Sequence, residues 1–137
     1  QAAITERSFQ AWIKPDTLVG SHIIYEEGGG TNAMGIRLIG QVLEFLTING
    51  GVRFNVTTPY TDTTEWHFIT AQFNDSNMTL YLDGVLVNTT TTSYASIFTG
   101  FTFQILSQYL PHGSFRRKKT QRAGLSKDMR VHNCSSR

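Results

Sequence analysis

The sequence predicts an all-β protein, an antiparallel sandwich or barrel, from three observations. Apolar and polar residues alternate with a period of two in several short segments, which is the period of a β-strand. Residue pairs that favour tight hairpin turns separate these segments. No segment of ten or more residues shows a helical period. The 137 residues form one domain, which can bury about two-thirds of its unfolded surface without disulfides.

The clearest pattern is a meander of three strands between Thr64 and Asn88. A run of turn-forming residues, Asn74 to Asn77, ends the first strand, because short polar side chains can hydrogen-bond their own backbone. Asp83-Gly84 ends the second strand and suits a two-residue type I′ turn. The predicted strands cover residues 65–73, 78–82 and 85–87.

Similar apolar runs predict strands in the rest of the chain. Gly40-Gln41 suits a type II′ turn, Asn49-Gly50 predicts another hairpin, and Pro59 ends the strand that follows. The additional strands are predicted over residues 8–14, 21–26, 34–39, 42–48, 52–57 and 97–106.

Charge divides the chain into an acidic body and a basic tail. Residues 1–113 hold four basic and nine acidic residues, a net charge of −5, whereas residues 114–137 hold eight and one, a net charge of +7. Basic runs bind polyanions such as sulfated glycans or nucleic acid, but a solvated loop or cleavable segment has the same composition. The basic run could also bind the acidic body of a second copy of the chain, which would lead to self-association. The run contains Arg116, Arg117, Lys118, Lys119 and Arg122.

No aromatic residue interrupts that basic run, which argues against stacking on single strands, and no nucleic acid is expected as the partner. Cys134 is the one cysteine, so no internal disulfide is expected, and either an intermolecular bridge or a free thiol remains. No run of about eighteen apolar residues predicts a membrane span. Because the chain opens at Gln1 without a leader, any signal peptide is expected to be removed or to lie outside this sequence.

Asn-x-Ser/Thr triplets predict a secreted, extracellular glycoprotein. Asn77 lies at a predicted turn, Asn88 follows a strand end, and Asn55 should point outward, so these three are expected to carry glycans first. Asn74 lies too close to Asn77 for both to be used readily. The five triplets begin at Asn55, Asn74, Asn77, Asn88 and Asn133.

Three segments resemble laminin-G-like domains of the concanavalin A-like lectin and glucanase superfamily. Ser8 to Pro15 is similar to the opening strand of that family. Trp66-His67 and Leu80-Tyr81-Leu82-Asp83-Gly84 are similar to its most recognisable segment, at the expected separation. The resemblance covers about Thr5 to Phe98 and implies a jelly roll of two packed antiparallel sheets. It also implies a structural role for Trp12, Trp66, His67, Asp83 and Gly84.

The residues from Gly124 to Asn133 keep part of the closing-strand pattern of that family, with a strand near Met129 to His132. Residues 1–113 would then form the body of the sandwich. Residues 114–137 would add the basic loop and this closing strand to the same domain.

Catalysis is not expected. The glucanases of this superfamily carry a Glu-x-Asp pair, and no Glu-x-Asp occurs here. Glu26-Glu27 adjoin a glycine triplet and are interpreted as a solvated turn, while Glu65 and Asp62 have no evident carboxylate partner.

No cofactor is expected apart from a candidate calcium ion, which many laminin-G-like domains bind through loop oxygens. The candidate calcium ligands are Asp62, Asp75 and Asp83. No other metal site is expected, because the histidines, His22, His67, His112 and His132, are scattered without helical zinc spacing. The tyrosines are open to two interpretations, a sugar-stacking platform on the rim or part of the core. They are Tyr25, Tyr60, Tyr94 and Tyr109.

The predicted function is a non-catalytic extracellular module for binding or adhesion, which recognises a glycan or a glycoprotein through rim loops or a concave sheet. The alternative is a structural glycoprotein subunit of an extracellular filament or surface assembly, with Cys134 or the basic tail in subunit contacts. The fold alone supports either, since it carries many functions.

Overall fold

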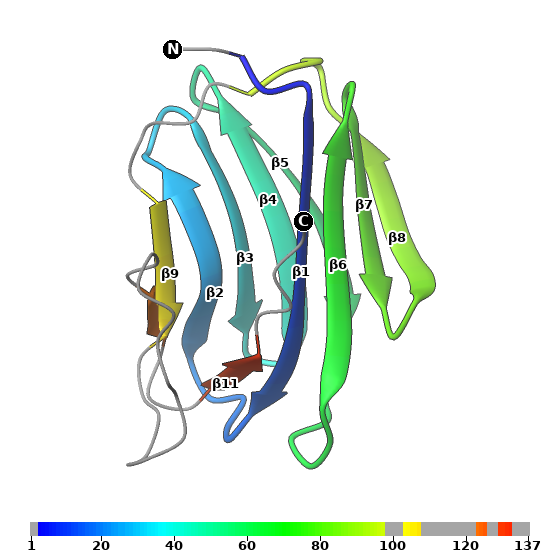
Figure 1. Ribbon diagram of the computed structural model, residues 1–137. Helices are drawn as coiled ribbons and strands as arrows, with labels where there is room; N and C mark the ends of the chain where they lie inside the picture. Colours follow the sequence, from blue (N-terminus) through cyan, green and yellow to red (C-terminus); the bar gives the residue numbers. More distant parts are fainter. Residues whose placement is uncertain (1–2, 98–102, 108–122, 126–128, 133–137) are drawn as a thin grey trace.

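The computed structural model describes residues 3–97, 103–107, 123–125 and 129–132, and every regular element among them is a strand (Figure 1). The described residues contain no helix that is long and apolar enough to span a membrane. The strands are β1 (Glu6–Pro15), β2 (Ser21–Gly28), β3 (Ala33–Ile39), β4 (Val42–Asn49), β5 (Val52–Pro59), β6 (His67–Asn74), β7 (Asn77–Leu82), β8 (Val85–Thr91), β9 (Phe103–Ser107), β10 (Ala123–Leu125) and β11 (Met129–His132).

Two packed sheets form the domain. A five-stranded sheet has the order β11-β1-β6-β7-β8, and a six-stranded sheet has the order β10-β9-β2-β3-β4-β5. Figure 1 shows the two layers, with β1 crossing in front of β4. All pairs are antiparallel except β9 with β10, which is parallel. The predicted two-sheet jelly-roll sandwich is therefore confirmed, with one parallel pair at the edge of the six-stranded sheet.

The hairpin turns follow the sequence signals, with one shift. Asp83 and Gly84 have φ angles of 51° and 78°, as a type I′ turn requires. The predicted turn at Asn49-Gly50 is wrong by one residue, because Asn49 still pairs with Val52. The turn residues are Gly50 and Gly51, with φ angles of 59° and 81°. Two consecutive glycines adopt positive φ without steric cost, so the hairpin closes one residue later.

The ends of the domain differ in part from the prediction. The closing strand is confirmed as β11, which pairs with β1 so that Trp12 lies opposite His132. Of the strand predicted over residues 97–106, residues 103–106 lie in β9. Ile97 forms an isolated bridge with Ile4, and the two residues exchange both backbone hydrogen bonds at 2.9 Å. Residues 98–102 lie outside the described part of the chain.

The core lies between the sheets and contains side chains from both. Phe45 of β4 and Phe73 of β6 are the largest of its fully buried members. A register shift between Ile23 and Tyr25 of β2 changes the side of the sheet to which the following residues point. Tyr25 therefore contacts Phe9 of the other sheet, with ring centroids 4.8 Å apart.

Candidate functional site

A hollow of about 180 Å³ lies on the outer face of the six-stranded sheet, across β2, β3, β4 and β5. Gly35 of β3 lines it opposite Leu46 of β4, and both lie on the face that points away from the core. A Cβ atom at Gly35 would lie 3.3 Å from the Tyr25 carbonyl oxygen and 3.7 Å from Leu46 Cγ. The missing side chain therefore keeps the floor of the hollow low. Apolar side chains, Ile23, Ala33, Leu46 and Ile48, surround this floor.

Two arginines form one side of the hollow, and a single carboxylate holds them. Glu44 lies on β4, between Arg37 of β3 and Arg53 of β5, and its side chain is 6% exposed. Arg37 Nε donates to Glu44 Oε2, and Arg53 Nη2 donates to Glu44 Oε1 at 2.8 Å. Asn55 Nδ2 donates to the same Oε1 atom at 2.9 Å. Burial acts to raise the pKa of Glu44, but these hydrogen bonds outweigh burial and hold the pKa below its usual value.

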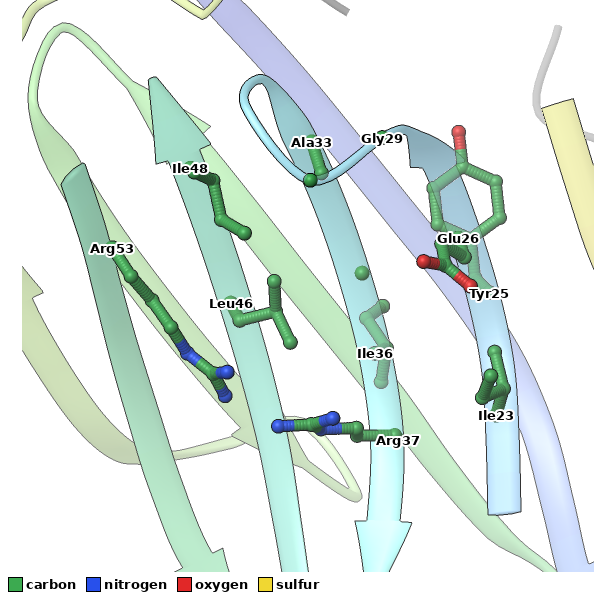
Figure 2. A pocket seen from close by; sticks show the side chains of 12 residues that line it. Ile23, Tyr25, Glu26, Gly29, Ala33, Ile36, Arg37, Leu46, Ile48 and Arg53 are labelled. Carbon is green, nitrogen blue, oxygen red and sulfur yellow. The ribbon is translucent and has the colours of Figure 1, made fainter. Parts of the chain in front are cut away.

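The arginines keep donors that this network does not use. The Nη1 and Nη2 atoms of Arg37, and the Nε and Nη1 atoms of Arg53, form no hydrogen bond with any residue that the structure describes. Figure 2 shows the two guanidinium groups pointing toward each other across β4. Their side chains are 29% and 42% exposed, so a ligand can reach them.

Glu26 of β2 supplies an acceptor on the other side of the hollow (Figure 2). Its carboxylate has no ion pair with a described residue. The hollow thus combines donors on one side, an acceptor on the other, and a small apolar floor between them. Such an arrangement suits a ligand with both polar edges and an apolar face.

The interpretation of Glu26-Glu27 as a solvated turn is wrong, because both residues lie within β2, where Glu26 pairs with Gly35 and Glu27 with Met34. Glu27 is also not solvated. Its side chain is 4% exposed and accepts hydrogen bonds from Arg7 Nη2 at 3.0 and 2.8 Å. The Tyr25 hydroxyl also donates to it. The register shift in β2 turns Glu27 inward, so this carboxylate joins β2 to β1 of the other sheet instead of facing water.

The sugar-stacking platform of tyrosines is also not formed by the described tyrosines. Tyr25 and Tyr60 are buried members of the core, and Tyr94 packs against it beside Phe73. Tyr94 also shares a hydrogen bond of 2.8 Å with Thr47. Tyr109 lies outside the described residues.

His67, for which the resemblance implies a structural role, lies between two carboxylates. Its Nε2 atom is 2.9 Å from Asp62 Oδ2, and its Nδ1 atom is 2.7 Å from Asp83 Oδ2. Asp83 Oδ1 accepts a hydrogen bond from the Phe68 backbone at 2.8 Å, and the Tyr60 ring packs edge-on against the imidazole. His67 therefore connects the loop before β6 to the β7–β8 turn.

The candidate calcium ligands do not converge. Asp62, in the loop before β6, and Asp83, in the β7–β8 turn, both bind His67, whereas Asp75 lies in the turn after the other end of β6. The described residues contain no group of three or more His, Cys, Asp or Glu side chains placed to hold a metal ion.

The His67 contacts predict how stability depends on pH. The hydrogen bond with Asp83 is the main cause that raises the pKa of His67, and the bond with Asp62 adds to it. A raised pKa means that this stabilisation is complete below about pH 6.5, the unfolded value, and is lost as the pH rises through the folded value. The stability difference between wild type and His67→Gln should therefore shrink between pH 6 and pH 9 in urea unfolding. A constant difference would contradict the charged contact.

The predicted glycosylation sites lie in several places. Asn55 is exposed and belongs to the Glu44 network, whereas Asn88 Nδ2 donates to the Thr57 carbonyl at 2.8 Å. Asn74 and Asn77 are exposed partners on either side of the β6–β7 turn, so glycans on both would crowd each other. Asn133 lies outside the described residues, as do Arg116, Arg117, Lys118, Lys119, Arg122, His112 and Cys134.

The two tryptophans differ in position. Trp12 is partly exposed on the outer face of the five-stranded sheet, where its ring centroid is 5.2 Å from that of Phe68. Trp66 is half-buried and directly precedes β6, which begins at His67 and not at Glu65. Glu65 is exposed, and its side chain takes part in no hydrogen bond or ion pair among the described residues.

Sequence reasoning missed the hollow and its residues. Arg37 and Glu44 lie at equal distances from the predicted Gly40-Gln41 turn, so they pair when the hairpin closes. This spacing could have predicted their ion pair from the sequence. Gly35 did not indicate the hollow in the sequence, because a glycine inside a strand can equally mark a bulge or the close approach of another backbone.

Comparison with known families agrees with this architecture. A family model described as the concanavalin A-like lectin/glucanases superfamily matches residues 3–135. The chain belongs to this superfamily. A comparison with curated proteins found no match.

Solved structures similar to this concanavalin A-like domain include binding domains of botulinum neurotoxins. The binding domain of serotype C1 has a TM-score of 0.60 at 21% identity, over 69% of this chain and 25% of that one. The type C toxin, whose cell entry depends on interaction with two ganglioside molecules, has a TM-score of 0.56 at 19% identity, with 69% and 28% covered. The DC binding domain in complex with rat synaptotagmin II has a TM-score of 0.57 at 20% identity, with 67% and 27% covered. The chain thus spans about a quarter of their length, and the likeness concerns the fold.

Proposed function

We propose that this concanavalin A-like domain is a non-catalytic module that binds a glycan or a glycoprotein through the hollow on its six-stranded sheet. The observation that best supports this function is that unused arginine donors and the Glu26 acceptor lie on opposite sides of an apolar floor. Sugars present this combination, because each ring has polar hydroxyl edges and an apolar face of C–H groups. The solved neighbours support a glycan or protein partner, since their described ligands include gangliosides and synaptotagmin II.

The carboxylates near the hollow support binding without turnover. Glycosidases need two carboxyl groups that flank the scissile bond, about 5 Å apart in retaining enzymes. Glu44 is engaged by two arginines, and Glu27 is enclosed between the sheets. Glu26 is therefore left without a second free carboxylate on this face among the described residues, and no hydrolysis of a bound oligosaccharide is expected.

An extracellular location is part of this proposal and rests on the Asn-x-Ser/Thr triplets. Among the described candidates, Asn77 and Asn88 are exposed on the sheet opposite the hollow, so glycans there would leave it accessible. A glycan on Asn55 would instead stand beside the Glu44 network.

Substituting Glu26 tests the proposal. Glu26→Gln should weaken binding of the best oligosaccharide on an array of neutral and acidic glycans by roughly tenfold, because a hydrogen bond to a charged acceptor contributes about 1.5–3 kcal/mol. Isothermal titration calorimetry measures the change. The matched control is Glu65→Gln, the same substitution at an exposed residue outside the hollow, which should bind as wild type does. Equal affinities for wild type and Glu26→Gln would contradict a site in the hollow.

The second candidate, a structural subunit of an extracellular assembly, is favoured by strand β8. It is an edge of the five-stranded sheet and exposes Val85 and Leu86, at 64% and 52%. Unprotected edge strands pair with strands of other chains. Sedimentation at increasing concentration separates the two candidates, because a binding module should stay monomeric and a structural subunit should form polymers.

A further inference from the structure

We propose that the hollow recognises a single carboxylated sugar, such as a terminal sialic acid residue, whose carboxylate binds between Arg37 and Arg53. This inference rests on the proposed glycan-binding function and names the class of sugar. The supporting observations are the net positive charge and the free donors of the cluster formed by Arg37, Arg53 and Glu44, and the negative charge of Glu26 on the other side of the hollow.

The cluster of Arg37, Arg53 and Glu44 contains two positive charges and one negative charge. Glu44 supplies one carboxylate for two guanidinium groups, so this side of the hollow keeps a net charge of about +1. Glu44 also fixes the positions of both groups, because each donates one nitrogen to a different carboxylate oxygen. A ligand therefore meets arginines that are already ordered, which reduces the entropy lost on binding.

The free donors match the geometry of a carboxylate. Arg37 binds Glu44 through Nε and leaves its two terminal nitrogens, which together form the planar fork that pairs with two carboxylate oxygens. Arg53 binds Glu44 through Nη2 and leaves Nη1 on the same outer face. One carboxylate would satisfy these donors and neutralise the cluster.

Glu26 limits how many negative charges the ligand can carry. Its carboxylate lies on the other side of the hollow, where it would repel a second anionic group and accept hydrogen bonds from hydroxyls. A peptide of successive acidic residues or a polyuronate would place charges on both sides. A neutral oligosaccharide that ends in one acidic sugar avoids this repulsion.

The size of the hollow also favours one ring. Sites for drug-sized ligands have volumes of roughly 300–1,000 Å³, whereas this hollow has about 180 Å³. The low floor at Gly35 and the apolar side chains around it would contact the apolar face of the ring.

Sialyllactose and its methyl ester test the charge directly, because the ester replaces the ionised carboxylate by a neutral group of similar shape with one added methyl. Sialyllactose should bind roughly tenfold or more tightly than the ester at low salt, given the strength of charge-assisted hydrogen bonds. Added salt should weaken binding of the acid and leave the ester unchanged, since exposed charges are screened. Isothermal titration calorimetry measures the affinities of the acid and the ester, each at low salt and with added salt.

Arg37→Lys tests the guanidinium geometry. The variant keeps the positive charge and a donor for Glu44 but loses the planar fork of the two terminal nitrogens, so its preference for the acid over the ester should fall roughly fivefold or more. Arg7→Lys is the matched control, because Arg7 binds Glu27 on the inner side of the sheet. It should keep the wild-type preference, and thermal unfolding should show that both variants fold.

The outcomes separate this inference from the proposed function. Equal affinity for acid and ester, with neutral glycans still bound in a manner sensitive to Glu26→Gln, overturns the carboxylated sugar and leaves the glycan site standing. Binding of no oligosaccharide overturns both. Tetraglutamate that competes as well as sialyllactose overturns the choice of a sugar.

Discussion

Replacing Glu27 by alanine should lower the free energy of unfolding by about 2–4 kcal/mol, because it breaks a largely buried ion pair between the two sheets. The Glu27 carboxylate accepts both hydrogen bonds from Arg7 and one from the buried Tyr25 hydroxyl. Its removal leaves the Tyr25 hydroxyl without this partner. Arg7 is 41% exposed and can turn to water, which keeps the loss below that of a fully enclosed pair.

The neighbouring residue provides the control for this prediction. Glu26→Ala makes the same chemical change one residue earlier, on the outer face of β2, and should alter stability by less than about 0.5 kcal/mol. Urea unfolding of both variants measures the difference. Equal losses would mean that Glu27 does not link the sheets.

Glu44→Ala should reduce both stability and binding. The loss of the carboxylate leaves Arg37, Arg53 and the Asn55 amide without their shared partner. Because the arginines are partly exposed, we expect a loss of about 2–3 kcal/mol, which is less than the roughly 3–5 kcal/mol lost when a fully buried pair is broken. Oligosaccharide binding should fall more than roughly tenfold, because the two guanidinium groups lose their fixed positions.

Urea unfolding and calorimetric titration check the two effects of Glu44→Ala separately. Glu6→Ala is the control, since Glu6 is exposed on β1 and has no ion pair with a described residue. Loss of stability with unchanged binding would mean that Glu44 supports the sheet but does not arrange a site.

The sequence was sufficient for the strands and most turns, because both depend on local patterns. Alternation defines a strand without knowledge of its partner, and Asp83-Gly84 specifies its turn through the φ angles it tolerates. The motifs around Trp66 and His67 were enough for the family. The hydrogen bonds of His67 to Asp62 and Asp83 required the structure, since they join a loop to a distant turn.

The candidate site was not predictable to the same degree, because it depends on register. The register shift beside Ile24 turns the side chains of Tyr25 and Glu27 to the inner face of the sheet, and no residue type at this place predicts a bulge. The shift of the turn to Gly50-Gly51 changes which residues of β5 lie beside Glu44. Sequence reasoning placed binding in rim loops or on a concave sheet without naming the residues of that sheet, because the hollow lies on a sheet face that three correct registers must assemble.

A nuclear magnetic resonance titration of the isotope-labelled domain with sialyllactose tests the central claim most directly. We expect shifts confined to the hollow, at the backbone amides of Gly29, Gly35 and Leu46 and at the side-chain Nε–H groups of Arg37 and Arg53. Shifts confined to the five-stranded sheet, or none at saturating sugar, would contradict a glycan site in the hollow.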